Sequence, residues 1–259
     1  VSKEAADVIL TDDNFATIVA AVEEGRAIFE NIRKFLRYLL SSNIGEVLTM
    51  FFGVLLAGML GLHIEEGVVV LPLLATQILW INLVTDGAPA MALGVEPAED
   101  DVMDRKPRPP GEGVITLKMW AGIALVGMTM AVGTLMVLDA SLRGGLIEGT
   151  GDLPYAQTMA FTTLMMFQLF NVFNSRSDTL SVVHGLFRNR WLWGAVALSL
   201  LLHFAVIYLP FLQKAFSTVA LSALDWCKCA VAASSVLWIR EISKWLSRRQ
   251  SASPPSLAD

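Results

Sequence analysis

A polar turn inside an apolar stretch is the part of this sequence best suited to bind an ion. Residues 71–95 are apolar enough to enter a lipid bilayer, yet they include Asn82, Thr85 and Asp86. These three lie at i, i+3 and i+4, so on a helix they share one face. An amide, a hydroxyl and a carboxylate on one turn offer oxygen ligands for a hard cation. The alternative is a kinked helix whose polar residues only bond neighbouring helices, but a carboxylate inside a membrane is costly and usually functional.

Pro89 adds a further oxygen to this turn. Proline has no N–H, so the carbonyl of Thr85, four residues earlier, loses its helical partner. In lipid, a freed carbonyl is tolerated only where it lines a protein cavity or meets an ion. The sequence therefore predicts a loosened helix with its polar face toward a cavity.

A second polar pair lies in another apolar run. Asn43 and Glu46 are at i, i+3 and can face the turn at 82–86. Asn43 could equally serve helix–helix hydrogen bonding, which is common in membranes. A buried Glu46, in contrast, needs a partner cation or a proton.

Long apolar runs are the elements that must position these residues. The chain has 259 residues, of which 54% are hydrophobic and 17% charged, with a mean hydropathy of +0.57. Length alone would allow one soluble domain. However, several runs reach the ~20 residues that a membrane span needs. We therefore expect an all-α membrane protein with a six-transmembrane-helix bundle, whose spans are at about 36–62, 71–93, 117–139, 156–174, 191–209 and 224–246.

The two ends of the chain are polar. Residues 6–10 are a strand candidate, 11–14 are rich in helix-capping residues, and a helical apolar pattern starts at Phe15. Residues 1–28 thus predict a short cytoplasmic α/β remnant, followed by an unbroken helix from about Arg26 to Leu62 and, at 247–259, a disordered tail. No cleavable signal peptide is visible, and the missing initiator Met suggests a fragment or a processed chain.

The distribution of basic residues predicts the orientation of the bundle. Six spans place both ends on one side. That side has fifteen Lys and Arg residues near it, against three on the other side, Arg143, Lys214 and Lys228. The positive-inside rule therefore predicts that both termini are cytoplasmic. No basic stripe with interleaved aromatic residues suggests nucleic-acid binding.

Two cysteines and a histidine in the apolar runs could form a disulfide bond, bind a soft metal or relay a proton. Cys227 and Cys229 are two residues apart, so on a helix they point to different sides and an intrachain bridge is not expected. A Cys-x-Cys site for a soft metal is conceivable, but no third ligand is evident. His203 is expected to bond a neighbouring helix, with a proton relay as the alternative.

Several of these motifs resemble one family. The run INLVTDG with its following Pro89, and the acidic, proline-rich loop from Gly94 to Pro110, are similar to the sixth membrane helix and next cytoplasmic loop of P-type cation pumps. Asn82, Thr85 and Asp86 match the type II calcium pumps of the sarcoplasmic-reticulum kind. The run EGRAIFENIRKFLRYLLSSN resembles the stalk that joins the phosphorylation domain to the membrane, and residues 1–28 then resemble the last strand and helix of that domain.

The resemblance implies a ligand set for a transported Ca²⁺. Asp86 would touch both ion positions of the family, and a glutamate often stands where this chain has Gln168, which keeps an oxygen but drops a charge. The implied metal ligands are Asn43, Glu46, Asn82, Thr85, Asp86 and Gln168. They supply oxygens only, which argues against soft ions. Flexible coordination by ligands from three helices suits Ca²⁺ better than Mg²⁺.

The resemblance also implies partners outside this sequence. A complete pump has earlier membrane helices and actuator, phosphorylation and nucleotide domains, which use ATP and Mg²⁺. The phosphorylated Asp of a DKTGT run does not occur here, and no P-loop is present, so this chain alone should not hydrolyse ATP. The expected function is the membrane half of a P-type ATPase that exports Ca²⁺ across the plasma membrane. The alternatives are a pump for Mn²⁺, Na⁺ or H⁺, and a membrane scaffold without transport activity.

Overall fold

The computed structural model describes residues 9, 14–62, 70–109, 111–177, 181–183 and 185–252, apart from the side chains of residues 247 and 250–252. Within these residues the chain is helical and contains no strand, only an isolated bridge between Leu142 and Gly151. The strand predicted at 6–10 lies outside the described residues except for Ile9, so the α/β remnant stays a prediction.

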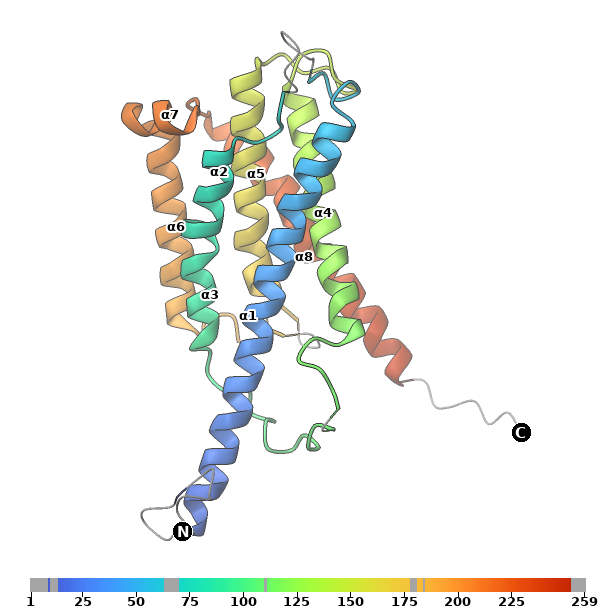
Figure 1. Ribbon diagram of the computed structural model, residues 1–259, viewed down its shortest axis with the longest axis vertical. Helices are drawn as coiled ribbons and strands as arrows, with labels where there is room; N and C mark the ends of the chain where they lie inside the picture. Colours follow the sequence, from blue (N-terminus) through green and yellow to red (C-terminus); the bar gives the residue numbers. More distant parts are fainter. Residues whose placement is uncertain are drawn as a thin grey trace, which may run out of the picture.

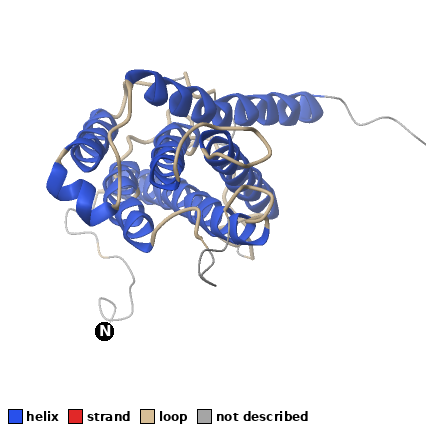
Figure 2. Cartoon of the chain, turned by 90° about the horizontal axis from the view of Figure 1, so that it is seen from above, coloured by secondary structure: helices blue, strands red, loops and turns tan. Residues whose placement is uncertain are grey.

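The long helices lie side by side, with α5 surrounded by the others (Figures 1 and 2). α5 buries most of its length, including polar residues from Thr158 to Asn174. The start of α1, the connection between α3 and α4 and the end of α8 lie at one end of the molecule, and α7 lies at the other. The elements are α1 (Phe15–Leu55), α2 (Ala75–Trp80), η1 (Ile81–Thr85), α3 (Gly87–Gly94), α4 (Leu117–Ser141), α5 (Leu153–Asn174), α6 (Arg190–Tyr208), α7 (Pro210–Phe216) and α8 (Ala223–Ala252).

α1 joins the helical pattern predicted from Phe15 to the unbroken helix predicted from about Arg26, and it ends before the predicted Leu62. It begins at Phe15 because the side chain of Asn14 caps it, accepting a hydrogen bond from the amide of Ala16 at 3.0 Å. It ends at Leu55 rather than Leu62, and a series of turns follows up to Gly61. Gly61 has a φ of +70°, a conformation that side chains disfavour, so the helix cannot continue through it.

Three of the described helices are long and apolar enough to cross a membrane, judged by length and composition. They are α1, α4 and α6, with mean hydropathies of 1.3, 2.1 and 1.8 in their most apolar windows. The segment 75–94 is divided by η1, so no single helix there has the length of a span. α8 continues to Ala252, which extends it into the predicted tail. A helical membrane protein is therefore supported, and the six-span arrangement stays a prediction.

Glycines allow α1 and α4 to approach closely. A Cβ atom on Gly127 would lie 2.5 Å from Cγ2 of Ile44 and 3.2 Å from the amide nitrogen of Gly45. A Cβ atom on Gly45 would in turn lie 2.9 Å from the sulfur of Met130. Small residues at such contacts let membrane helices pack by van der Waals attraction. Since α1 carries Glu46, this contact also fixes the helix that positions a site residue.

We expect Gly127→Ala to destabilise the fold. The added methyl group must displace Ile44 or the backbone of α1, and overpacking of this kind costs about 1–3 kcal/mol. The measurement is thermal unfolding of the detergent-solubilised protein. The matched control is Gly194→Ala in α6, where an added Cβ meets nothing within 4 Å, so stability should not fall. Equal effects of both substitutions would contradict the proposed close contact.

The connection between α3 and α4 lies against the lower part of α1. The guanidinium of Arg26 donates to the carbonyls of Val102 and Arg105, at 3.0 and 2.9 Å. Lys34 pairs with Glu99 at 3.4 Å. Hydrogen bonding from Arg105 lowers the pKa of the exposed Asp101 carboxyl below its ordinary value. Within this chain, the loop is held on α1 by polar contacts.

Candidate cation-binding site

The helix that carries Asn82, Thr85 and Asp86 is broken as Pro89 predicted. η1 has π-helical spacing, shown by the amide of Asp86 donating to the carbonyl of Ile81 at 3.0 Å. The carbonyl of Thr85, which Pro89 deprives of a helical donor, accepts a hydrogen bond from the hydroxyl of Tyr38 at 3.3 Å. π-turns inside helices occur frequently at functional sites.

Glu46 joins three segments of the chain. Its Oε2 accepts a hydrogen bond from Nδ2 of Asn82 in η1 at 2.6 Å. Its Oε1 accepts one from Nε2 of Gln168 on α5 at 2.9 Å. Glu46 is 4% exposed and Gln168 is 0% exposed. The structure therefore brings together residues separated by up to 122 positions in the chain.

Asp86 is the second buried carboxylate of the cluster and is 1% exposed. Its Oδ1 accepts a hydrogen bond from the hydroxyl of Tyr38 at 2.8 Å. Tyr38 is fully buried and contacts both Asp86 and the carbonyl of Thr85, so it ties α1 to the broken helix. Two carboxylates buried away from solvent attract a cation strongly, because the local dielectric constant is low.

Four buried oxygen atoms in and beside the cluster have no hydrogen-bond partner among the described residues. They are Oγ of Ser42, Oγ1 of Thr85, Oδ2 of Asp86 and Oε1 of Gln168. A buried polar atom without a partner is costly, so each one requires an explanation such as a bound ion. The described residues contain no group of three His, Cys, Asp or Glu placed to hold a metal. The candidate site is therefore a mixed set of carboxylate, amide, hydroxyl and carbonyl oxygens.

The structure does not bring Asn43 into this cluster. Its side chain is exposed and donates from Nδ2 to the carbonyl of Leu39 on its own helix, at 2.8 Å. Relative to Glu46, Ser42 is about 40° around the helix on one side and Asn43 about 60° on the other. The cluster lies on the side of Ser42, which is buried. The Asn43 side chain thus does not face the turn at 82–86, contrary to the expectation from the sequence, and Asn43 is not among the residues that the structure brings together.

Sequence analysis missed Tyr38 and Ser42. Both lie on the face of α1 that contains Glu46, at spacings of four residues. That spacing was the available signal. A tyrosine near the end of an apolar run is usual at membrane interfaces, so only its contacts identify it as part of the site.

The other reactive side chains lie apart from this cluster. Nε2 of His203 on α6 is 3.1 Å from Oγ1 of Thr162 on α5, in agreement with the expected bond to a neighbouring helix. Cys227 is exposed and Cys229 is buried, and both are free thiols.

Comparison with known proteins identifies the family of this chain. The family described as cation transporting ATPase, C-terminus, matches residues 70–246. The chain is 48% identical over 226 residues to a calcium-transporting ATPase of Bacillus subtilis, covering 87% of this chain and 24% of that protein. It is 41% identical over 249 residues to the human calcium-transporting ATPase type 2C member 1, covering 96% of this chain and 25% of that protein.

A third relative is also a calcium-transporting ATPase. The chain is 39% identical over 252 residues to calcium-transporting ATPase 1 of Yarrowia lipolytica, covering 97% of this chain and 25% of the relative. It thus spans about a quarter of the length of the curated relatives it matches. Since the family covers most of the sequence, the helices and the buried polar cluster belong to the C-terminal membrane region of a P-type cation-transporting ATPase.

Proposed function

We propose that this chain is the ion-binding transmembrane part of an ATP-driven pump that exports Ca²⁺ from the cytoplasm. The observation that carries the proposal is the buried cluster around Glu46 and Asp86, with unpartnered oxygens on Thr85, Asp86 and Gln168. Ca²⁺ accepts oxygen ligands of mixed type in flexible geometry, and the cluster offers them from three separate segments. The proposed ligands are Glu46, Asn82, Thr85, Asp86 and Gln168.

The broken helix supports transport rather than permanent binding. A transported ion must be released, so its ligands have to rearrange. The segment 75–94 is divided by η1, and its Asn82, Thr85 and Asp86 are held by hydrogen bonds to Tyr38 and Glu46 of α1. Discontinuous membrane helices of this kind commonly form ion sites in transporters.

The remaining parts of the pump are proposed partners. The relatives are about four times as long as this chain, and the sequence contains no DKTGT run. We propose that ATP and Mg²⁺ act on phosphorylation and nucleotide domains elsewhere in the pump, and that residues 1–259 by themselves hydrolyse no ATP. In this arrangement the chain crosses the plasma membrane six times, with both termini in the cytoplasm.

The test is ion uptake by the complete pump in sealed vesicles. We expect ATP-dependent accumulation of ⁴⁵Ca that is abolished by a calcium ionophore and persists with excess Na⁺ or at altered pH. Parallel uptake of ⁵⁴Mn measures the main divalent competitor. ATP-dependent Mn²⁺ uptake without Ca²⁺ uptake would reassign the ion. The absence of uptake of either ion in vesicles that hold folded pump would refute the proposed function.

A further inference from the structure

A buried ion pair lies just after α3, where the segment that carries Asn82 and Asp86 continues into the connection to α4. α3 ends at Gly94, and Glu96 follows at the start of the connection to α4. Its Oε1 accepts a hydrogen bond from Nε of Arg176 at 2.8 Å, and Nη2 of the same arginine is 2.6 Å away. The two side chains are 4% and 10% exposed. Removing either partner would leave an uncompensated buried charge, so neither can be lost without consequence.

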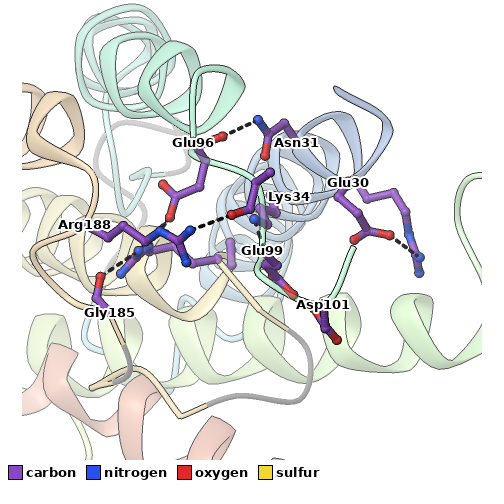
Figure 3. A network of polar contacts seen from close by, with 12 residues as sticks. Glu30, Asn31, Lys34, Glu96, Glu99, Asp101, Gly185 and Arg188 are labelled. Atoms are coloured by element: carbon purple, nitrogen blue, oxygen red, sulfur yellow. Dashed lines mark hydrogen bonds and ion pairs between the residues drawn. The ribbon is translucent and has the colours of Figure 1, made fainter. Parts of the chain in front are cut away.

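Two asparagines complete the contacts of Glu96, and Figure 3 shows one of them, Asn31, beside it. Nδ2 of Asn189, the N-cap residue of α6, donates to Oε2 of Glu96 at 2.5 Å and to the carbonyl of Ala92 at 2.8 Å. Nδ2 of Asn31 on α1 donates to the backbone carbonyl of Glu96 at 2.7 Å. We call these four residues, Glu96, Arg176, Asn189 and Asn31, the Glu96 clamp. The clamp joins Asn31 on α1, Glu96 just after α3, Arg176 just after α5 and Asn189 at the start of α6.

The Glu96 clamp and the ion site share two elements. α1 carries Asn31 of the clamp and also Tyr38 and Glu46 of the site. α3 runs from the clamp to Asp86 over eight residues, or about 12 Å at 1.5 Å per residue. A helix this short transmits a shift of one end to the other. On its far side Asp86 adjoins η1, a π-helical turn of the kind found frequently at functional sites.

We propose that the Glu96 clamp is a positioning device for the ion site. By holding α3 at a second point on α1, it keeps Asp86 in register with Tyr38 and Glu46, so that the oxygens meet around one ion. Arg176 is the deciding member, because its guanidinium neutralises Glu96 and also donates to the carbonyl of Gly185 at 2.9 Å in the α5–α6 connection. Arg176 is a positioning residue and touches no ion. This inference rests on the proposed binding of Ca²⁺ by the cluster.

Equilibrium binding of ⁴⁵Ca to the complete pump tests the inference, because it separates affinity from the amount of folded protein. We expect Arg176→Met to raise the Kd on the order of tenfold, as residues that influence a binding site without touching its ligand can do, with the number of sites per pump unchanged. Arg176→Lys keeps the charge but loses the forked contact, so its Kd should lie between those of Arg176→Met and the unmutated pump.

The matched control is Arg188→Met. Arg188 joins the same two connections through Asp100 at 2.8 Å, but its side chain is 39% exposed and that of Asp100 is 86% exposed. Its removal should leave the Kd unchanged. A wild-type Kd in Arg176→Met, with or without fewer binding sites, would show a purely structural role and overturn the inference. If the Arg176→Met pump does not accumulate in the membrane, the Kd of Arg176→Lys is measured instead. A wild-type Kd in that variant would overturn the inference. An unmutated pump that binds no ⁴⁵Ca would instead refute the proposed function.

Discussion

Replacement of Asp86 by asparagine in the complete pump is expected to abolish calcium-dependent phosphorylation by ATP. The substitution keeps the shape of the side chain and its contact with Tyr38, but it removes one of the two carboxylates in the cluster. Calcium affinity depends strongly on the number of charged ligands, so the Kd should rise on the order of a hundredfold or more. The measurement is phosphoenzyme formation over a range of free Ca²⁺ concentrations, together with ⁴⁵Ca binding.

The fold should survive this substitution. Removing a buried charge lowers the desolvation cost in the absence of the ion, so Asp86→Asn should unfold at a temperature equal to or above that of the unmutated protein. The matched control is Asp100→Asn, the same chemical change on a side chain that is 86% exposed in the α3–α4 connection. It should leave both phosphorylation and Kd unchanged. Wild-type calcium affinity in Asp86→Asn would place the ion elsewhere.

Gln168→Glu is expected to increase the number of bound calcium ions from one toward two. Glu46 and Asp86 are the carboxylates that the described part of the chain places in the cluster, which gives it two negative charges. Two Ca²⁺ ions bring four positive charges, and the imbalance is costly in a low-dielectric setting. The unmutated pump should therefore bind one ion tightly.

The contacts of Gln168 show why this position matters. Its Nε2 donates to Oε1 of Glu46 at 2.9 Å, and its own Oε1 has no partner among the described residues. A glutamate there would lose the donor and face a second carboxylate at short range, an arrangement that a second cation relieves. The number of ⁴⁵Ca ions per phosphorylatable site is the quantity to measure.

Gln157→Glu is the control for this stoichiometry. Gln157 lies on the same helix and is 6% exposed, but its amide contacts the carbonyl of Leu71, away from the cluster. The same chemical change should leave the ion count at one. Two ions per site in the unmutated pump would contradict the charge argument, and a count of one in Gln168→Glu would show that charge does not limit the number of ions.

Local features of the site could be predicted from the sequence because they depend on neighbouring residues only. Pro89 cannot donate to the carbonyl of Thr85 in any fold, so the break was predictable, and the structure adds that Tyr38 supplies the donor. Asn82, Thr85 and Asp86 share a turn for the same local reason. The start of α1 after Asn14 also follows from local capping chemistry. Most long apolar runs likewise correspond to helices, and α1, α4 and α6 have the length and hydropathy of spans.

The tertiary structure decided which side of each helix faces the site. A helix advances 100° per residue, so Ser42 lies on one side of Glu46 around the helix axis and Asn43 lies on the other. Sequence spacing alone therefore could not tell which of the two side chains faces the cluster. The partner helices made that choice, since the cluster with Asn82 and Gln168 lies on the side of Ser42. The pairing of Glu96 with Arg176, 80 residues away, was also absent from any local pattern. Contacts between distant residues depend on how the helices pack, and that packing minimises buried, unpaired polar groups over the whole molecule rather than within one segment.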